Sequence, residues 1–460
     1  MARPLIAADD GTPRYQQISA RLRAQIGDGT LMAGERLPAS RALAQDLGVA
    51  RTTVVAAYDQ LTAEGYLEAR RGAGVFVCDV APISPPAAPA AGAPDPAPAR
   101  ILHLEPGKAD PEVFPTLPWA RCVARVARSA PKALVFLEDP FGDPALRAEI
   151  AAYAGRWRGI TASAEQVIVT NGASEALDMA MSLLIRDGRV ALEAPGYDPL
   201  FRKLRQRGWS PQWLRPGSQG YAPAGDPASV TVLTPSHQFP LGGTLPVPAR
   251  QAFLRAAEEN GGWVIEDDFD SEFRYAGRPV PAMAALDEAG RCIYVGTFSK
   301  TFSHALRLGY LILPRALVPQ FRAAMRHPSG GAPVSAQRPM AEFMASGQYD
   351  RHIRRARRLY AQRYKAAADT IAGWPDHLGH FQRHEAGMQI AFHLPGGTDD
   401  TALAKAAENH GIGIKPLSAF DPDGVMRGLL IGFCQSLPED IPPLLDQLRD
   451  LIRAHQDSGE

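Results

Sequence analysis

Residues 37–77 read LPASRALAQDLGVARTTVVAAYDQLTAEGYLEARRGAGVFV, and this stretch decides the fold of the N-terminal part of the chain. Ser40 is placed to cap a short helix, RALAQDLG, that Gly48 closes. After a three-residue turn, the next helix begins at about Arg51 and stops at Gly65. Its inward-facing residues at helical spacing are Val54, Tyr58 and Leu61. Two helices joined by so short a turn predict a helix-turn-helix unit.

The residues on either side extend this unit. Upstream, Ile18, Leu22 and Ile26 repeat at helical spacing, which predicts a first helix. Downstream, residues 66–77 alternate apolar and polar side chains around a tip at Gly72–Gly74, which predicts a β-hairpin. A hairpin in this place would form the wing of a winged helix-turn-helix.

Polar side chains lie where such a unit would face duplex DNA. The first turn of the second helix of the pair carries Arg51, Thr52 and Thr53, which fall outside the apolar stripe and can meet base edges or phosphates. Residues 1–78 hold nine basic and eight acidic side chains, so charge alone leaves open a protein-interaction domain whose arginines only solvate one face. The positions of the arginines favour DNA binding; these are Arg41, Arg51, Arg70 and Arg71.

The segment resembles the DNA-binding domain of the GntR family of bacterial regulators over nearly its whole length. The matching positions are Leu37-Pro38, Ser40-Arg41, Leu43-Ala44, Val49, Arg51, Thr53-Val54, Tyr58, Leu61, Glu64-Gly65 and Gly72-x-Gly74. The resemblance implies that Arg41, Arg51, Thr53 and the wing at Gly72 and Gly74 contact DNA.

Length and composition frame the rest of the chain. At 460 residues, two or more domains are expected. Lysine plus arginine and aspartate plus glutamate both number 49, so any DNA binding must come from a local surface. The four cysteines show neither metal-ligand spacing nor a disulfide framework, and no signal peptide or membrane span is found. A soluble, cytoplasmic protein without a metal site is therefore expected.

Residues 79–100 consist almost entirely of proline, alanine and glycine, which favour an extended conformation. This composition predicts a linker; the alternative is a long surface loop within one domain. The expected domains are thus a DNA reader at 12–78 and a larger domain at 101–455.

The larger domain alternates helical segments with short apolar runs. The runs are QVIVT, RVALEA, SVTVLT, WVIED and CIYVGTF. Such alternation predicts an α/β fold with a mostly parallel sheet covered on both faces. Ligands of such sheets bind at the carboxyl ends of the strands, and polar residues of this chain follow those ends.

Two of the strand ends indicate a ligand site only weakly. The turn TNGASEAL, at 170–177, is small enough for backbone N–H groups to approach a phosphate at a helix N-terminus. In APGYDP, Tyr197 could lie over a flat ring or belong to the core, and the residues alone favour the core.

The other two strand ends are followed by side chains with more specific chemical roles. In WVIEDDFDSEF, a carboxylate leaves a buried strand and can hold a pyridine nitrogen protonated. In YVGTFSKTFSHALRLGY, Lys300 can form a Schiff base, while Thr297, Ser299 and Arg307 can surround a phosphate. A solvated loop lysine is the ordinary alternative, but the acidic strand end and the phosphate cradle argue against it.

These features in this order resemble the fold-type I pyridoxal-phosphate enzymes, the aminotransferase superfamily, over residues 101–455, with a smaller C-terminal subdomain. The resemblance implies pyridoxal 5'-phosphate as cofactor, an aldimine on Lys300, a pyridine partner at Asp267 and a ring stacked on Tyr197. The phosphate would lie at Ala173, Ser174, Thr297, Ser299 and Arg307, and Arg427 would hold a ligand carboxylate. A GntR reader joined to this domain resembles the MocR subfamily of GntR regulators.

Two positions depart from the enzyme pattern. Phe269 stands where a tyrosine commonly follows the ring-binding aspartate, and Phe239 stands where the NPTG-type motif has asparagine. Both changes weaken the case for efficient transamination more than the case for cofactor binding. Whether any transaminase turnover remains is left open.

Residues 351–365 concentrate arginines on a predicted helix, which is either a solvated or subunit-facing surface or a stripe that touches DNA phosphates. By resemblance, a homodimer in the bacterial cytoplasm is expected.

The leading hypothesis is a regulator that senses an amine, an amino acid or a B6 vitamer through Lys300. An aminotransferase with an accessory DNA-binding domain and a repressor with a cofactor-free dimerisation scaffold are the alternatives. The effector, the operator and the direction of regulation do not follow from the sequence.

Overall fold

The computed structural model describes residues 12–79, 102–217, 221–277, 280–325 and 331–457. The chain divides into two compact units, Met1–Ala99 and Arg100–Glu460, and each has a hydrophobic core of its own. The predicted linker falls, apart from Asp79, outside the described residues. Within the described ranges no helix is both long and apolar enough to span a bilayer.

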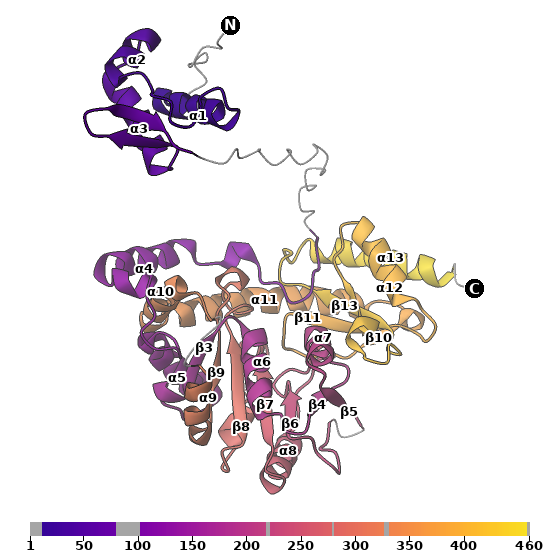
Figure 1. Ribbon diagram of the computed structural model, residues 1–460. Helices are drawn as coiled ribbons and strands as arrows, with labels where there is room; N and C mark the ends of the chain where they lie inside the picture. The colour runs from indigo at the N-terminus through magenta and orange to yellow at the C-terminus, as the bar shows by residue number, and fades with distance from the viewer. Residues whose placement is uncertain (1–11, 80–101, 218–220, 278–279, 326–330, 458–460) are drawn as a thin grey trace. The chain divides into compact units, whose positions relative to one another are not determined.

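The N-terminal unit consists of helices followed by a hairpin (Figure 1). Its elements are α1 (Arg14–Gly27), α2 (Ser40–Leu47), α3 (Arg51–Ala63), β1 (Leu67–Arg70) and β2 (Gly74–Val77). The two strands pair antiparallel, with Leu67 opposite Val77 and Arg70 opposite Gly74. The winged helix-turn-helix expected from the sequence is confirmed.

The core of this unit is the apolar face that the sequence predicted. Its fully or nearly fully buried members include Ile18, Leu22, Ile26, Val54, Tyr58 and Leu61. Gly48 ends α2 in the left-handed conformation, with φ 63°, as predicted. The capping prediction at Ser40 is wrong, because Ala39 is the N-cap and Ser40 is the first helical residue. The hydroxyl of Tyr58 donates to the Pro38 carbonyl at 2.9 Å just before the helix, and the Ser40 hydroxyl lies 3.4 Å from Arg51 Nε, toward α3.

The C-terminal unit contains a seven-stranded sheet in the order β3-β9-β8-β7-β6-β4-β5. Its strands are β3 (Val167–Thr170), β4 (Arg189–Glu193), β5 (Ser210–Leu214), β6 (Val230–Leu233), β7 (Trp263–Asp268), β8 (Cys292–Thr297) and β9 (Gly309–Ile312). The strands from β8 to β5 pair in parallel, whereas β9 runs antiparallel to both of its neighbours. The predicted mostly parallel sheet is confirmed, and β5 and β9 are additions to the predicted strands.

Helices cover both faces of this sheet (Figure 1). They are α4 (Thr116–Ser129), α5 (Pro144–Arg158), α6 (Ala173–Leu184), α7 (Asp198–Arg207), α8 (Val247–Glu259), α9 (Val318–Ala324) and α10 (Val334–Ala345). Val167 and Val169 pack into a core with residues of α5 and α10, whereas Ile168 between them packs into a second core with residues of α6 and α7. The alternation of side chains along a strand thus fills a core on each side.

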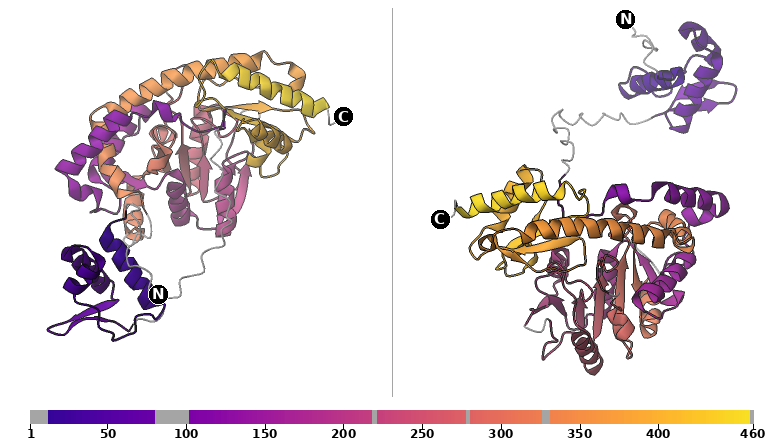
Figure 2. Two further views of the ribbon diagram at one scale, coloured as in Figure 1. Left: turned by 90° about the horizontal axis from the view of Figure 1, so that it is seen from above. Right: turned by 180° about the vertical axis from the view of Figure 1, so that it is seen from behind.

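A second, smaller sheet lies in the C-terminal part of this unit, with the antiparallel order β10-β11-β13-β12. Its elements are β10 (His380–Phe381), β11 (Gln389–His393), β12 (Lys415–Pro416) and β13 (Gly428–Gly432), with helices α11 (Gln348–Ala372), α12 (Asp400–Asn409) and α13 (Ile441–Asp457). The long helix α11 connects the two parts (Figure 2), because Ile353 belongs to a core of the large sheet while Ile371 belongs to the core of the small one. The predicted C-terminal subdomain is confirmed.

The first described residues after the linker run beside the small sheet. The N–H of His103 donates to the Gly411 carbonyl at 2.8 Å, and the N–H of Gly432 donates to the Leu104 carbonyl at 2.8 Å. Leu104 is buried with a positive φ of 57°. This segment therefore lies directly against β13, and it continues into the cavity described below.

Candidate functional site

A cavity of about 280 Å³ opens at the carboxyl ends of the strands of the large sheet. Its walls include residues within four positions of the ends of β3, β4, β6, β7 and β8, and ligands of mostly parallel sheets bind at such ends. All eight residues predicted to bind the cofactor line it: Ala173, Ser174, Tyr197, Asp267, Thr297, Ser299, Lys300 and Arg307. The structure thus brings together side chains that the sequence separates by more than a hundred positions.

Lys300 follows β8 and points into this cavity. Its Nζ atom donates a hydrogen bond to the carbonyl oxygen of Gly107, at 2.6 Å. Burial lowers the pKa of the Lys300 amine, while the nearby Asp270 carboxylate acts in the opposite direction. A lysine whose amine is more readily neutral is a better nucleophile toward a carbonyl carbon.

Asp267 is the second group with a specific chemical role. It is buried near the end of β7, and its Oδ1 atom has no hydrogen-bond partner among the described residues. Burial, together with the neighbouring Asp268 and Asp270, raises the pKa of Asp267 to about 7, although Lys300 lowers it. A buried carboxyl group with an unused acceptor fits a partner that brings its own proton, as the pyridine nitrogen of pyridoxal phosphate does.

Backbone groups and an arginine form the anion-binding end of the cavity. Ala173 and Ser174 occupy the first turn of α6, where N–H groups are free of helical partners. Gly309 makes this end compact, because a Cβ atom there would lie 2.6 Å from the backbone carbon of Gly172. The Nε atom of Arg307 lies 3.2 Å from Asn171 Oδ1, so the guanidinium is held beside the same turn. These residues fit the phosphate of pyridoxal phosphate.

Aromatic side chains line the space between these groups. Phe239 contacts Tyr197, Phe269 and Phe420 with ring centroids 5.9, 5.8 and 5.1 Å apart, each nearly edge to face. Phe239 and Phe269, the two departures from the enzyme pattern, both line the cavity. The wall is therefore apolar where the enzyme pattern has an asparagine and a tyrosine.

A buried pair beside Lys300 was missed from the sequence. Both carboxylate oxygens of Asp270 lie 3.0 Å from His237 Nδ1. Asp270 lines the cavity, and a Cβ atom at Gly387 would overlap the His237 ring. Glycine at 387 thus lets the histidine sit against Asp270. The sequence signal was the third acidic residue in DDFD, but its partner is 33 positions away.

The structure separates Arg427 from the other predicted residues. Arg427 does not line the cavity, and its Nη1 atom donates to the carbonyls of Gly424 and Met426 within its own loop. The strand that follows it, β13, presents Leu430 to the cavity instead, next to Lys415 from β12. Lys415 was not predicted, because only the pairing of these two strands places it there.

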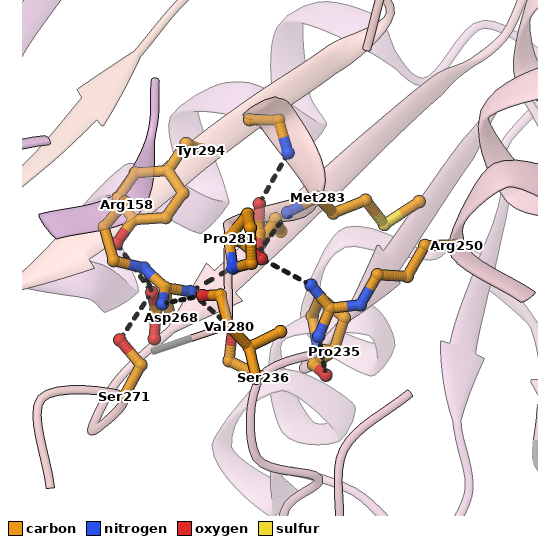
Figure 3. A network of polar contacts seen from close by, with 12 residues as sticks. Arg158, Pro235, Ser236, Arg250, Asp268, Ser271, Val280, Pro281, Met283 and Tyr294 are labelled. Atoms are coloured by element: carbon orange, nitrogen blue, oxygen red, sulfur yellow. Dashed lines mark hydrogen bonds and ion pairs between the residues drawn. The ribbon is translucent and has the colours of Figure 1, made fainter. Parts of the chain in front are cut away.

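A buried network supports the cavity from the opposite face of β7 (Figure 3). Arg158 from α5 forms an ion pair with Asp268, at 2.8 Å, and donates to Ser236 Oγ at 2.5 Å. The hydroxyl of Tyr294 also donates to Asp268, at 2.7 Å. Because side chains alternate along a strand, these contacts on Asp268 leave Asp267 facing the cavity.

A second arginine belongs to the same network. Arg250 is fully buried and donates to the carbonyl oxygens of Pro235, Leu245 and Pro281 at 2.6 to 2.8 Å (Figure 3). It thereby holds the chain that leaves β6 and leads to Phe239. The network thus supports both the strand that carries Asp267 and the chain that carries Phe239 in the aromatic wall of the cavity.

The N-terminal unit exposes the residues predicted to contact DNA. Arg41, Arg51, Thr52, Arg70, Arg71 and Gly72 are exposed, and Thr53 and Gly74 are half-buried. The Nε atom of Arg51 lies 3.4 Å from Ser40 Oγ, across the turn between α2 and α3. Arg70 is engaged within the wing, where it pairs with Glu68 and lies over the ring of Phe76.

Comparison with protein families gives two matches along the chain. Residues 14–77 match the model of the bacterial regulatory proteins of the gntR family, and residues 116–427 match the model of aminotransferase class I and II. The two matches fall on the two units of the structure.

Individual proteins resemble the chain over most of its length. It is 34% identical to the probable rhizopine catabolism regulatory protein MocR of Rhizobium meliloti, over 98% of this chain and 96% of that protein. It is 37% identical to the pyridoxine biosynthesis transcriptional regulator PdxR of Corynebacterium glutamicum, over 78% of this chain and 79% of that protein.

Among solved structures, the α-aminoadipate aminotransferase LysN of Thermus thermophilus is similar with a TM-score of 0.70 and 26% identity. The match covers 78% of this chain and 94% of that one. The large unit thus has the fold of a fold-type I aminotransferase. With a gntR-type reader before that fold, and full-length similarity to MocR, this chain belongs to the MocR subfamily of the GntR family of bacterial regulators.

Proposed function

We propose that this protein is a transcription regulator that binds pyridoxal 5'-phosphate and responds to an amine, an amino acid or a B6 vitamer through Lys300. The observation that carries the proposal is one cavity that holds a buried lysine, a partnerless buried carboxyl group and an anion cradle. The same chain carries a gntR-type DNA reader.

Each wall of the cavity has a distinct task in this proposal. When bound, pyridoxal phosphate supplies an aldehyde carbon that primary amines attack reversibly. Asp267 would hold the ring nitrogen in its protonated form, and Ser174 and Arg307 would bind the phosphate. Lys300 would hold the aldehyde, and Gly107 offers its carbonyl to the lysine amine whenever that amine is free.

Regulation requires that the effector bind two conformations of the protein unequally. The segment at 102–107 is the part of the large unit closest in sequence to the linker, and its Gly107 touches Lys300. A change at Lys300 therefore acts on the chain that leads to the DNA reader. A homodimer that reads two half-sites through Arg41, Arg51, Thr52, Thr53, Arg70, Arg71, Gly72 and Gly74 completes the proposal.

The competing function is an aminotransferase with an accessory DNA-binding domain. The intact pair of Lys300 and Asp267 favours it, because both would serve transamination as well. Phe269 and Phe239 weigh against it, because they remove two polar groups from the cavity wall. Repeated turnover between amino and keto acids by the full-length protein would support the enzyme, whereas a single transfer or none would support the sensor.

The central test is a titration with amines. Wild-type protein loaded with pyridoxal phosphate should change its visible absorbance and its affinity for a selected DNA duplex over the same range of amine concentration. Lys300→Ala should lose both changes, and Lys365→Ala, on the exposed face of α11, should keep both. A Lys300→Ala protein that kept both responses would refute the proposal. A colourless wild-type protein that showed no spectral change with pyridoxal phosphate would favour a cofactor-free scaffold.

A further inference from the structure

A histidine and an aspartate form a buried pair beside Lys300. The side chains of His237 and Asp270 are 4% and 1% exposed, and His237 Nδ1 lies 3.0 Å from each oxygen of the carboxylate. An ionised carboxylate only accepts hydrogen bonds, so Nδ1 carries a proton and donates it between the two oxygens. No other group in the described ranges donates to this carboxylate. Asp270 therefore depends on His237 for the partner that a buried charge requires.

The packing around the pair fixes the direction of the imidazole. A Cβ atom at Gly387 would overlap the ring of His237, and the ring of Phe269 lies beside it with centroids 5.8 Å apart. The N–H of Gly387 donates to the Phe273 carbonyl at 2.8 Å, and the N–H of Phe273 donates to the Asp270 carbonyl at 2.9 Å. The turn that carries Asp270 is thus tied to the residue that packs on the imidazole.

Asp270 brings a negative charge to the reactive amine. Both Asp270 and Lys300 line the cavity, whereas His237 does not. Burial lowers the pKa of the Lys300 amine, and among the surrounding charges the Asp270 carboxylate opposes this most strongly. The other titratable groups that face Lys300 come from four further parts of the chain: Asp267, Cys434, Lys108 and His304.

These neighbours cannot replace the charge of Asp270. Burial raises the pKa of Asp267 to about 7 and that of the Cys434 thiol well above its usual range, so at neutral pH neither supplies a full negative charge. The groups that face the pair itself are uncharged as well, because burial raises the pKa of the Tyr275 hydroxyl and lowers that of His384. The carboxylate that His237 holds is therefore the main negative charge that acts on Lys300.

We propose that His237 is a positioning residue, which holds the Asp270 carboxylate and its negative charge toward Lys300. Without the Nδ1 donor the buried carboxylate would take up a proton, because an unpaired charge is costly away from water. The Lys300 amine would then lose its own proton at lower pH. The inference rests on the proposed function only for its consequence: a histidine outside the cavity wall would set the pH range in which Lys300 holds the cofactor.

The experiment measures the protonation of Lys300 in cofactor-free, full-length protein. The rate at which acetic anhydride modifies Lys300 is followed against pH by mass spectrometry, with the exposed Lys365 as an internal standard. Asp270→Asn should move the midpoint of this profile to lower pH by about one pH unit, since a nearby opposite charge is lost. His237→Leu should move it in the same direction by a similar amount. The double variant should show no further shift, because His237 acts only through Asp270.

Conservative variants separate the donor from the bulk of the side chain. Asparagine carries its amide nitrogen on Cγ, as histidine carries Nδ1, so His237→Asn should keep the midpoint near that of wild type. Glutamine carries its nitrogen one atom further out, so His237→Gln should shift the midpoint as His237→Leu does, and it replaces that variant if leucine prevents folding. His393→Leu removes a half-buried histidine of β11 outside the cavity and should leave the profile unchanged.

A purely structural role for His237 predicts a different result. In that case His237→Leu and His237→Gln would lower the melting temperature and leave the acetylation profile of Lys300 where it is in wild type, and the proposal would be overturned. Shifts that add up in the double variant would overturn it too, because His237 would then act on Lys300 without Asp270.

A second measurement distinguishes failure of this inference from failure of the proposed function. In protein loaded with pyridoxal phosphate, the pH at which the visible absorbance changes should move in the same order among the variants. If the wild-type protein takes up no pyridoxal phosphate, the proposed function fails, and the acetylation profile still decides on His237. If the wild type is coloured but all variants share one acetylation midpoint, the role of His237 is refuted and the proposed function stands.

Discussion

The Nζ atom of Lys300 lies 2.6 Å from the carbonyl oxygen of Gly107, although the two residues are 193 positions apart in the chain. Gly107 belongs to the first described stretch after the linker, and Lys300 follows the end of β8. The hydrogen bond joins the segment that leads from the DNA reader to the reactive group of the cavity. This contact gives the first prediction.

Gly107→Ala should destabilise the protein by about 1 to 2 kcal/mol, because Gly107 has a φ of +69° that an L-residue adopts at a cost. The added Cβ atom would also lie 2.9 Å from Lys300 Nζ, so uptake of pyridoxal phosphate should become slower. Gly261→Ala, at φ +63° with no atom within 4 Å, should lose similar stability and keep normal uptake. Stopped-flow absorbance and urea unfolding measure the two effects; equal uptake rates in both variants would contradict the prediction.

In the cofactor-free protein, two buried carboxyl groups should contribute stability that is lost as the pH rises from about 4 to about 7. Burial raises the pKa of Asp267 and of Glu193 to about 7, so in this window the folded protein binds more protons than the unfolded chain. The stability that these two groups contribute is therefore fully present below their unfolded pKa and is lost as the pH rises through the folded pKa. For Asp267 the loss amounts to about 4 kcal/mol.

Asp267→Asn should remove this share of the loss, because an amide does not titrate. Urea unfolding of both proteins without cofactor, at several pH values, checks the difference in slope. Glu288→Gln, at an exposed position, serves as the control and should keep the wild-type slope. If Asp267→Asn followed the wild-type curve throughout, the carboxyl group would not have the buried environment described.

Arg158→Met should destabilise the protein by about 3 to 5 kcal/mol, since removal of one partner leaves the buried Asp268 carboxylate uncompensated. Arg449→Met breaks two exposed ion pairs on α13 and should cost less than about 1 kcal/mol. Chemical denaturation of the two variants gives the comparison. Similar losses would show that the network behind β7 is no more important than a surface pair.

Arg51→Ala should weaken binding to DNA at least tenfold while the fold of the reader is kept, because Arg51 is exposed at the start of α3. The probe is a duplex selected from a random library by the wild-type protein. Arg23 lies on α1 and pairs with Glu64. Arg23→Ala should change the affinity for DNA less than about twofold. The slope of affinity against salt should fall by about one only if Arg51 meets a phosphate; an unchanged slope would point to a base.

Local patterns predicted most of the fold. Helical spacing located Ile18, Leu22 and Ile26 in the reader, and the five apolar runs of the large domain all became strands. The cap at Ser40 was mispredicted by one residue: Ala39 precedes α2, and the Ser40 hydroxyl contacts Arg51 of α3, which local sequence does not reveal. β9 was not predicted, although residues 308–313 form an apolar run; its antiparallel place between β3 and β8 depends on the long-range pairing of strands.

The site was predictable where the residues follow strand ends. Lys300 and its neighbours Thr297, Ser299 and Arg307 were found because parallel strands deliver their carboxyl ends to one place. The choice of Asp267 among the acids, and of Ala173 and Ser174, came from the resemblance to fold-type I enzymes. Lys415 and His237 were missed because their positions depend on strand register and on long-range packing. Arg427 was assigned by resemblance to the place where fold-type I enzymes hold a substrate carboxylate; in the structure its Nη1 atom donates to two carbonyls of the loop that precedes β13.

The three consecutive acids of β7, Glu266 to Asp268, have different surroundings because successive side chains of a strand point to opposite faces of the sheet. Glu266 and Asp268 stay with the arginines on one side, and Asp267 stands alone on the other. In such a strand a substitution changes one side chain, whereas an insertion or deletion changes the face to which every following side chain points. One residue inserted ahead of Glu266 would turn the whole row over, burying Asp267 among the arginines and presenting a misplaced acid to the cavity. We therefore expect β7 to be a part of this chain in which insertions and deletions cannot persist.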